Sequence, residues 1–393
     1  MNSLRRQSAR LYSTMSASYP TSSPFTQAVV SSMRKLYPES LADKSWDNTG
    51  LLLEAPFDHT RRQKNSVLLA IDLTKAVADE AIARRDSVVV AYRAQCPPKT
   101  PTHHHRLTQV TYPDPIIFRG LKSITFNDPQ QSSLLRLAQE GISVYSPHTA
   151  IDATPGGMAD WLCDIVTGAI APTTSRKPTI QKSSSTHYSH ATFPDPQPAS
   201  PATPVPHVRN TIIPSPPPVP EGMDSAGMGR IVTFDEPQPL TAVVDRIAQG
   251  VGYPGGIPIA IPQTSSVEDI KIRTVGVCPG SGSSILLKGT GGKIPDLLFT
   301  GELSHHEALA AVERGSVVVA LAHSNTERGY LRAVMREKLA GAVKEEWEAK
   351  RKEGLEGGGA AGAELKEVFE DAECVVDVSE KDRDPYGIMI RQA

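Results

Sequence analysis

Two imidazole–carboxylate pairs with the same spacing could hold metal ions. His323 and Glu327 lie in LAHSNTERG, and His148 and Asp152 lie in SPHTAIDA, so each pair is four residues apart. Imidazole nitrogen and carboxylate oxygen are ordinary ligands of divalent metal ions. For the first pair alone, a local hydrogen bond and a stabilised helix start are at least as good an interpretation. The second pair, in the other half of the chain, favours a shared site.

Each pair follows an apolar run that is expected to form a buried strand. Residues 316–322 contain three consecutive valines, and residues 141–145 read GISVY. Runs of β-branched residues are typical of strands that are covered on both faces. Open α/β sheets place their sites at the carboxyl ends of such strands. We therefore expect two similar α/β lobes that face one site.

Further strands and helices alternate along the chain and predict the fold class. Strands are expected at residues 66–71, 87–92, 270–277 and 297–300, and helices at 25–36, 75–83, 128–140, 157–166 and 240–248. This alternation predicts an α/β protein of two related three-layer lobes with mainly parallel sheets and the metal site between them.

The lobes are expected at residues 24–170 and 228–393. Residues 171–227 are so rich in Ser, Thr and Pro that we expect a disordered linker, with His187, His190 and His207 solvated. Within the second lobe, the charged and Gly-rich residues 345–366 are interpreted as a surface excursion. Residues 374–378 and 386–390 are expected to be closing strands.

Composition narrows the functional classes. The 393 residues hold 41 Lys plus Arg against 43 Asp plus Glu, a balance that argues against direct nucleic-acid binding. The four cysteines are widely spaced without a CxxC pair, which favours a reducing compartment over a disulfide framework or a thiolate zinc site. No apolar run is long enough to span a bilayer, so no membrane partner is expected.

The first residues have the composition of a targeting segment. Residues 1–19 contain Arg5, Arg6 and Arg10, and no acidic residue occurs before Glu39. An arginine-rich, serine-rich and acid-poor start favours a mitochondrial transit peptide, cut near Tyr12, over an ordinary disordered terminus. Initiation at Met15 would leave a cytoplasmic form.

A glycine loop, CPGSGSS at residues 278–284, follows one of the expected strands. Backbone N–H groups of such a loop can cradle an anion, and a plain tight turn explains it equally well. Both interpretations stay open.

Seven segments resemble the NIF three-like family. The family includes the YbgI-type dinuclear metal-centre proteins, also called GTP cyclohydrolase I type 2-like, and this chain looks like a eukaryotic, fungal-like member. The segments are WDNTGLLLE, VLLAIDLT, PIIFRGLKSIT, SPHTAIDA, GMGRIV, TGELSHHEAL and AHSNTERG, in family order. The resemblance implies two related lobes, two divalent ions (Zn, Mn or Fe) between them, and a homo-oligomer.

The resemblance also implies roles for particular residues. The metal ligands carried over by motif are Asp152, His323 and Glu327. Residues expected close to them, in supporting or substrate-facing roles, are His148, Glu302, His305 and His306.

The function implied by the resemblance is hydrolase-type chemistry on a nucleotide-like or phosphorylated substrate, with the catalytic residues, substrate-binding residues and substrate unassigned. The alternative, from another class, is a non-catalytic partner of a transcriptional co-regulator in which the metals are structural.

One segment departs from the family pattern. The family's usual HHP motif is missing: Tyr92 stands where its first histidine would be and Arg93 where the second should be. Residues 93–114, RAQCPPKTPTHHHRLTQVTYPD, then interrupt the family-like sequence. The three histidines at 103–105 lie among prolines without hydrophobic periodicity, which favours a flexible polar loop over a metal site.

We interpret residues 93–114 as a retained intron. An arginine codon can contain a splice donor, the codons of Pro113 and Asp114 can contain an acceptor, and joining the two in frame encodes histidine. The hypothesis predicts that the chain as written binds metal poorly.

Overall fold

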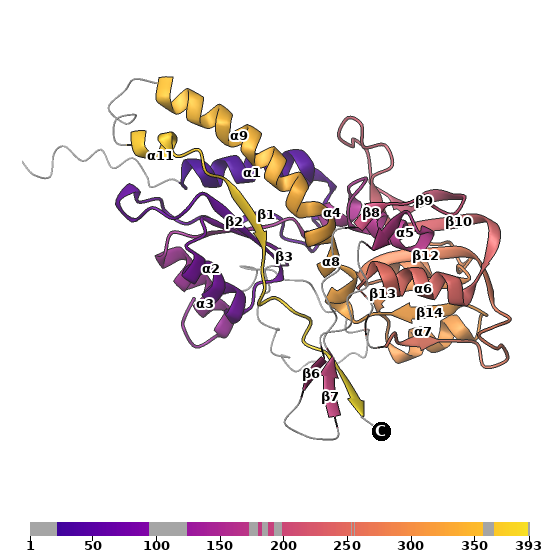
Figure 1. The fold of residues 1–393 in the computed structure, drawn as a ribbon. Helices are drawn as coiled ribbons and strands as arrows, with labels where there is room; N and C mark the ends of the chain where they lie inside the picture. Colours follow the sequence, from indigo (N-terminus) through magenta and orange to yellow (C-terminus); the bar gives the residue numbers. More distant parts are fainter. Residues whose placement is uncertain are drawn as a thin grey trace, which may run out of the picture.

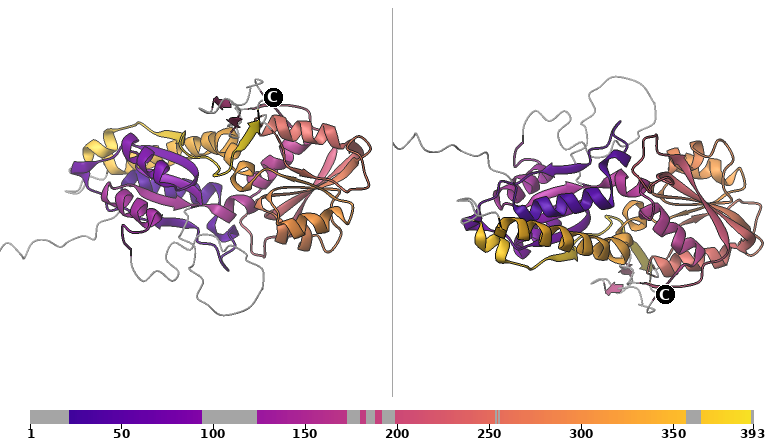
Figure 2. Two further views of the ribbon diagram at one scale, coloured as in Figure 1. Left: turned by 90° about the horizontal axis from the view of Figure 1, so that it is seen from below. Right: turned by 90° about the horizontal axis from the view of Figure 1, so that it is seen from above.

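The computed structural model describes residues 22–93, 124–172, 180–182, 188–191, 199–252, 254, 256–356 and 365–391. The chain forms two α/β lobes that lie side by side (Figure 1; Figure 2). The expected targeting segment, His187, and the insert beyond Arg93 with its three histidines lie outside the described residues.

The first lobe is built on a five-stranded sheet. Its order is β1 (Gly50–Leu53), β4 (Ser143–Ser146), β3 (Val88–Arg93), β2 (Ser66–Asp72) and β15 (Val375–Val378). Only β1 runs antiparallel to its neighbour. Every residue of β2, β3 and β4 is buried, as their apolar runs predicted.

Helices cover both faces of this sheet and complete three layers. Helices α1 (Pro24–Leu36) and α9 (Arg336–Glu356) lie on one face, and α2 (Lys75–Arg84) and α3 (Pro129–Gln139) on the other (Figure 1). Alternate residues of β2 serve the two layers: Leu69 packs with the first pair of helices and Leu68 with the second.

The long helix α9 corrects the expectation of a surface excursion at residues 345–366. Leu339, Val343 and Trp347 recur every four residues and are buried, and the Trp347 ring meets Phe25 of α1 edge-on at 5.5 Å. The apolar stripe is narrow and most of the helix is charged, so the composition of this segment did not indicate a helix packed on the core. Together with β15, α9 returns the chain to the first lobe, so residues 228–393 do not all belong to the second.

The second lobe is built on a six-stranded sheet. Its order is β11 (Ile259–Ala260), β14 (Val317–Ala320), β13 (Leu297–Glu302), β12 (Lys271–Ser281), β10 (Gly227–Pro239) and β9 (His207–Pro214). Strands β12, β13 and β14 are parallel, and the other three pairings are antiparallel. The mainly parallel arrangement therefore holds for the first lobe, whereas the second sheet is mixed.

The layers of the second lobe also correct the expected boundaries. Helices α5 (Met158–Thr167) and α6 (Leu240–Gly250) cover one face, and α7 (His305–Val312) with η3 (Ser284–Lys288) covers the other. Helix α5 was expected in the first lobe. Strand β9 lies inside the expected linker and pairs with β10, because its alternating residues satisfy a sheet edge despite the prolines around it.

Short elements complete the described chain. They are η1 (Glu39–Leu41), η2 (His59–Arg61), α4 (His148–Ala153), β5 (Ile170–Pro172), β6 (Ile180–Lys182), β7 (Tyr188–Ala191), β8 (Ala199–Pro201), η4 (His323–Thr326), α8 (Arg328–Tyr330), η5 (Leu331–Met335), α11 (Lys366–Glu370) and β16 (Ile388–Arg391). Among the described helices, none combines the length and apolarity needed to cross a membrane.

Candidate functional site

The carboxyl ends of the parallel strands of both lobes meet at the junction between them. Asp72 ends β2 and Arg93 ends β3, while α4 follows β4 and η4 follows β14. Figure 1 shows α4 and α8, which directly follows η4, at this junction. The imidazole–carboxylate pairs of α4 and η4 thus come to one place, as the position of sites in open α/β sheets predicts.

His323 is oriented by one carboxylate and faces another. Its Nδ1 lies 2.8 Å from Glu302 Oε1, and its Nε2 lies 3.7 Å from Glu327 Oε1. A proton on Nδ1 donates to Glu302 and leaves the Nε2 lone pair directed at Glu327, which is how proteins prepare a metal-binding histidine. Burial opposes protonation, but the hydrogen bond that His323 donates to Glu302 and the charge of Glu327 outweigh it and raise the pKa of His323.

The glycine loop of residues 278–284 makes room for this pair. Gly280 has φ +59°, and a Cβ there would lie 2.7 Å from Glu327 Oε1 and 2.9 Å from His323 Nε2. The Gly280 N–H donates to Thr326 Oγ1 at 2.9 Å, and its carbonyl accepts from Thr300 Oγ1. With its N–H committed to the protein, Gly280 supports the tight-turn interpretation over an anion cradle.

Asp152 approaches from the first lobe. It is buried, and the Tyr92 hydroxyl lies 2.7 Å from both of its oxygens. A hydroxyl carries one proton and donates to one oxygen at a time. Burial raises the pKa of Asp152 to about 7, although the charge of His148 and the hydrogen bond from Tyr92 act in the opposite direction. The structure therefore leaves this carboxyl group in need of a cation if it is to be ionised.

His148 forms the wall beside Asp152. Its Nδ1 lies 2.8 Å from Asp47 Oδ1, and the rings of Trp46 and Tyr92 meet it edge-on at 5.6 and 5.2 Å. Asp47 therefore orients the His148 ring. Trp46 is half-buried, with its ring against the imidazole.

Arg93 crosses the junction. Its Nη2 donates to Glu327 Oε2 at 2.8 Å and its Nη1 to Glu327 Oε1 at 3.3 Å, while its Nε lies 3.5 Å from Asp72 Oδ1. Burial raises the pKa of Glu327 although the Arg93 charge acts in the opposite direction. The position was noted in the sequence only as a missing histidine. Its position at the end of an expected strand, next to the strand that ends in Asp72, could have indicated a place in the site.

Two carboxylates from the end of the chain support the site, and the sequence pattern did not reveal them. Asp382 accepts from the Ile71 N–H at 2.7 Å and pairs with Arg328. Asp384 accepts from the Ser324 N–H at 3.0 Å and from its hydroxyl at 2.6 Å. Residues 379–384 therefore form a strap from β2 of the first lobe to η4 of the second.

Not every expected neighbour joins the site. His305 and His306 are exposed at the start of α7, where their rings contact each other with centroids 5.3 Å apart. In the part of the chain that the structure describes, no hydrogen bond or ion pair links them to His323 or Glu327. Glu302, by contrast, is in the site.

The chemistry of Asp152, His323 and Glu327 suits a divalent ion, and their approach at the junction fits the predicted role. As they stand, however, the described residues include no group of three His, Cys, Asp or Glu placed to hold a metal ion. The Arg93 guanidinium engages both Glu327 oxygens. Metal binding thus stays a prediction.

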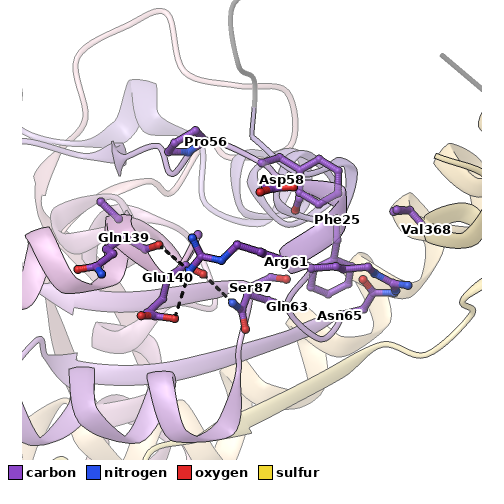
Figure 3. A pocket seen from close by; sticks show the side chains of 15 residues that line it. Phe25, Pro56, Asp58, Arg61, Gln63, Asn65, Ser87, Gln139, Glu140 and Val368 are labelled. Atoms are coloured by element: carbon purple, nitrogen blue, oxygen red, sulfur yellow. Dashed lines mark hydrogen bonds and ion pairs between the residues drawn. The ribbon is translucent and has the colours of Figure 1, made fainter. Parts of the chain in front are cut away.

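A hollow lies away from the junction, at the amino end of the first sheet (Figure 3). This cavity of about 230 Å³ is lined by residues that precede β2, β3 and β4, among them Asn65, Ser87 and Gly141. Its polar groups pair with each other: Arg61 donates to the Gln139 carbonyl and lies 3.9 Å from a Glu140 oxygen. It lacks the convergent ligands of the junction, and we assign it no function.

Comparison with solved structures supports the same two-lobed fold. A Bacillus cereus protein related to NIF3 matches with a TM-score of 0.54 at 18% identity, covering 92% of this chain and 98% of that one. The protein ybgI, described as of unknown function, matches with a TM-score of 0.52 at 16% identity, covering 90% and 96%.

Sequence comparison is more specific. The chain is 39% identical over 317 residues to Protein NIF3 homolog of Schizosaccharomyces pombe, covering 80% of this chain and 88% of the relative. It is 33% identical over 313 residues to NGG1-interacting factor 3 of Saccharomyces cerevisiae, covering 78% and 88%. The family model Duf34/NIF3 (NGG1p interacting factor 3) matches residues 26–94 and 110–352, and so skips part of the expected insert. With most of both lobes matched, the chain belongs to the Duf34/NIF3 family.

Proposed function

We propose that the junction performs hydrolase-type chemistry on a nucleotide-like or phosphorylated small molecule with the help of divalent metal ions. Asp152, His323 and Glu327 would hold the metal. A bound divalent ion would supply an activated water and polarise the bond under attack.

The observation that carries this proposal is the orientation of His323. Glu302 holds its Nδ1 while Nε2 faces Glu327 across the space left by Gly280. A histidine in a purely structural role needs no open nitrogen directed at a buried carboxylate. The protein groups then have separable tasks: Glu302 fixes the imidazole, and Tyr92 supplies a proton donor to Asp152.

Elemental analysis tests the metal site. Purified protein loaded with Mn, Zn or Fe should lose most of its bound metal when His323→Ala and Glu327→Ala are combined. His305→Ala is the matched control, because that imidazole is exposed and outside the site. Unchanged metal content in the double variant would remove the site.

Turnover tests the chemistry. A panel of phosphoesters and nucleotides is assayed with each metal, with and without Asp152→Ala. We expect activity on one class of substrate that Asp152→Ala abolishes. Equal inactivity of both proteins on the whole panel would refute the hydrolase proposal.

A second candidate function follows from one relative. The Saccharomyces cerevisiae protein is named NGG1-interacting factor 3 and matches over 88% of its length. The alternative proposal is that this chain is a non-catalytic partner of a transcriptional co-regulator of that kind. Binding of the full chain to NGG1, unchanged by Asp152→Ala and by chelator, would favour this role, and absence of binding would remove it.

We also propose that the chain forms a homo-oligomer and is imported into mitochondria. A homo-oligomer is tested by light scattering of the full chain. Mitochondrial import is tested by a fluorescent fusion of residues 1–24, which should leave the cytosol.

A further inference from the structure

Arg93 joins carboxylates of both lobes at the junction. It is 5% exposed and stands beside Asp72 in the register of β2 and β3. Its guanidinium faces both Glu327 oxygens as a fork and has Asp72 beside Nε. Glu327 lies 234 positions further along the chain. One side chain therefore supplies positive charge to a carboxylate from each lobe.

A buried, ionised carboxylate requires a cation beside it. The space next to Glu327 holds only one cation at a time. An ionised carboxylate without a partner in a buried site is strongly unfavourable. A guanidinium matches a carboxylate with two parallel hydrogen bonds, and it stays protonated at any ordinary pH. It is also part of the same chain, so its local concentration is far above that of a free metal ion. A divalent ion at Glu327 would have to displace it.

We infer that Arg93 is the resident cation of the junction in this chain: its guanidinium takes the place of a divalent metal ion at Glu327, holds the lobes together without metal, and excludes metal from that carboxylate. The inference rests on the proposed function for the identity of the ion that Arg93 replaces. The exclusion is specific to Glu327, because Arg93 has no hydrogen bond to Asp152 or His323 among the contacts of the described residues.

The surroundings of Arg93 distinguish it from an ordinary buried ion pair. The carboxylate it binds is the same one that His323 Nε2 faces at 3.7 Å. Gly280 leaves no side chain between that imidazole and Glu327. An arginine placed only for stability would not need to share its carboxylate with an oriented histidine.

The experiment compares the full chain with Arg93→His, with Arg246→His as the matched control. Arg246 is a half-buried arginine that donates to the Val166 carbonyl, away from the junction. Each protein is stripped with chelator and titrated with Mn²⁺ or Zn²⁺ by calorimetry, with bound metal counted by elemental analysis. We expect Arg93→His to bind metal about tenfold or more tightly than the unsubstituted chain, the size of effect that single ligand-supporting residues have on metal affinity. The control should not differ from the unsubstituted chain.

A second readout titrates the unsubstituted chain and does not depend on the folding of Arg93→His. The Arg93 Nε–H resonance, identified by its loss in Arg93→Lys, should keep its shift and its slow exchange when Zn²⁺ is added. A resonance that moves or broadens in proportion to bound metal would show that the guanidinium is displaced, and it would overturn the inference.

The outcomes separate this inference from the proposed function. Tight metal binding by Arg93→His that Glu327→Gln abolishes, with weak binding by the unsubstituted chain, supports the inference and the proposed ligands, and it limits the metal-dependent chemistry to a chain with histidine at position 93. Equally tight, Glu327-dependent binding by the unsubstituted chain overturns the inference and leaves the proposed metal site standing. No binding by either protein overturns the inference and the metal part of the proposed function together.

Discussion

Arg93 of the first lobe and Arg230 of the second are both almost fully buried, and the two arginines are bound in different ways. Arg230, on β10 of the second lobe, is 2% exposed and forms two 3.0 Å bonds with Asp160 of α5. Its remaining Nη1 donates to the Gly227 and Gly229 carbonyls at 2.7 and 3.0 Å. All of these partners lie in one lobe, so this arginine fastens α5 to the sheet beneath it.

Arg93 of the first lobe has its partners divided between the lobes. It binds Glu327 across the junction and has Asp72 beside it within its own sheet. The comparison teaches that burial and a carboxylate partner do not by themselves define a role. The pair of Arg230 with Asp160 stabilises one lobe, because every partner of Arg230 is local. In the pair of Arg93 with Glu327, the arginine acts as the cation of a site, because Glu327 also faces an imidazole.

The largest expected change concerns the origin of Arg93. Arg230 lies in sequence that the family model matches without a break, whereas the match stops at residue 94 and resumes at 110. If residues 93–114 are a retained intron, the mature protein has one histidine in their place. We expect the chain rebuilt with that histidine to bind metal about tenfold or more tightly than the chain as written.

Sequencing the mature transcript decides this prediction directly. Transcripts that lack the intervening codons confirm it, and transcripts that retain them throughout show that the arginine is genuine. The calorimetric titration of both proteins gives the affinities.

The largest expected loss of stability belongs to Arg230. Replacing Arg230 by Met leaves Asp160 without its two-point partner, and breaking one side of a buried pair costs about 3–5 kcal/mol. Urea unfolding measures the change. Arg209→Ala is the control, since Arg209 also binds Asp160 but is less buried and should cost less. A loss no larger than that of the control would contradict the structural role assigned to Arg230.

The strap of residues 379–384 should contribute less to stability than Arg230, and its loss should also expose the junction between the lobes to proteolysis. Asp382→Asn weakens the bond to the Ile71 N–H and the ion pair with Arg328, and charged hydrogen bonds of this kind contribute about 1.5–3 kcal/mol each. We expect a loss near the lower end together with faster proteolysis between the lobes. Glu380→Gln, an exposed change in the same strap, should have neither effect. Unchanged proteolysis in Asp382→Asn would show that the strap does not hold the junction.

The smallest effect is a pH dependence of the second lobe. Burial opposes ionisation of Asp160, but the hydrogen bond and charge of Arg230 outweigh it and lower the pKa of Asp160. The stability from a lowered pKa is fully present above the unfolded value of about 3.9 and is lost as pH falls through the folded value. We expect the urea midpoint of unfolding to decrease as the pH is lowered below about 4. The decrease should be less steep in Asp160→Asn. Equal slopes for the two proteins would contradict this.

The sequence predicted the parts of the fold that depend on local pattern. The apolar runs of β2, β3 and β14 showed their burial, because a strand covered on both faces needs an unbroken series of β-branched residues. The rule that sites lie at the carboxyl ends of parallel strands brought His323 and Glu327 to attention. The repeated spacing after a second strand added His148 and Asp152, and family resemblance added Glu302; the structure places all three at the same junction.

The tertiary structure alone decided how the two lobes meet. Whether α5 and α9 pack on one lobe or the other depends on which exposed apolar stripe they cover, and that partner is far away in the sequence. The pairing of Arg93 with Glu327, and of Asp382 and Asp384 with β2 and η4, likewise depends on distances in space. A local pattern records whether a side chain is buried, whereas the choice of its partner is made only when both lobes have folded.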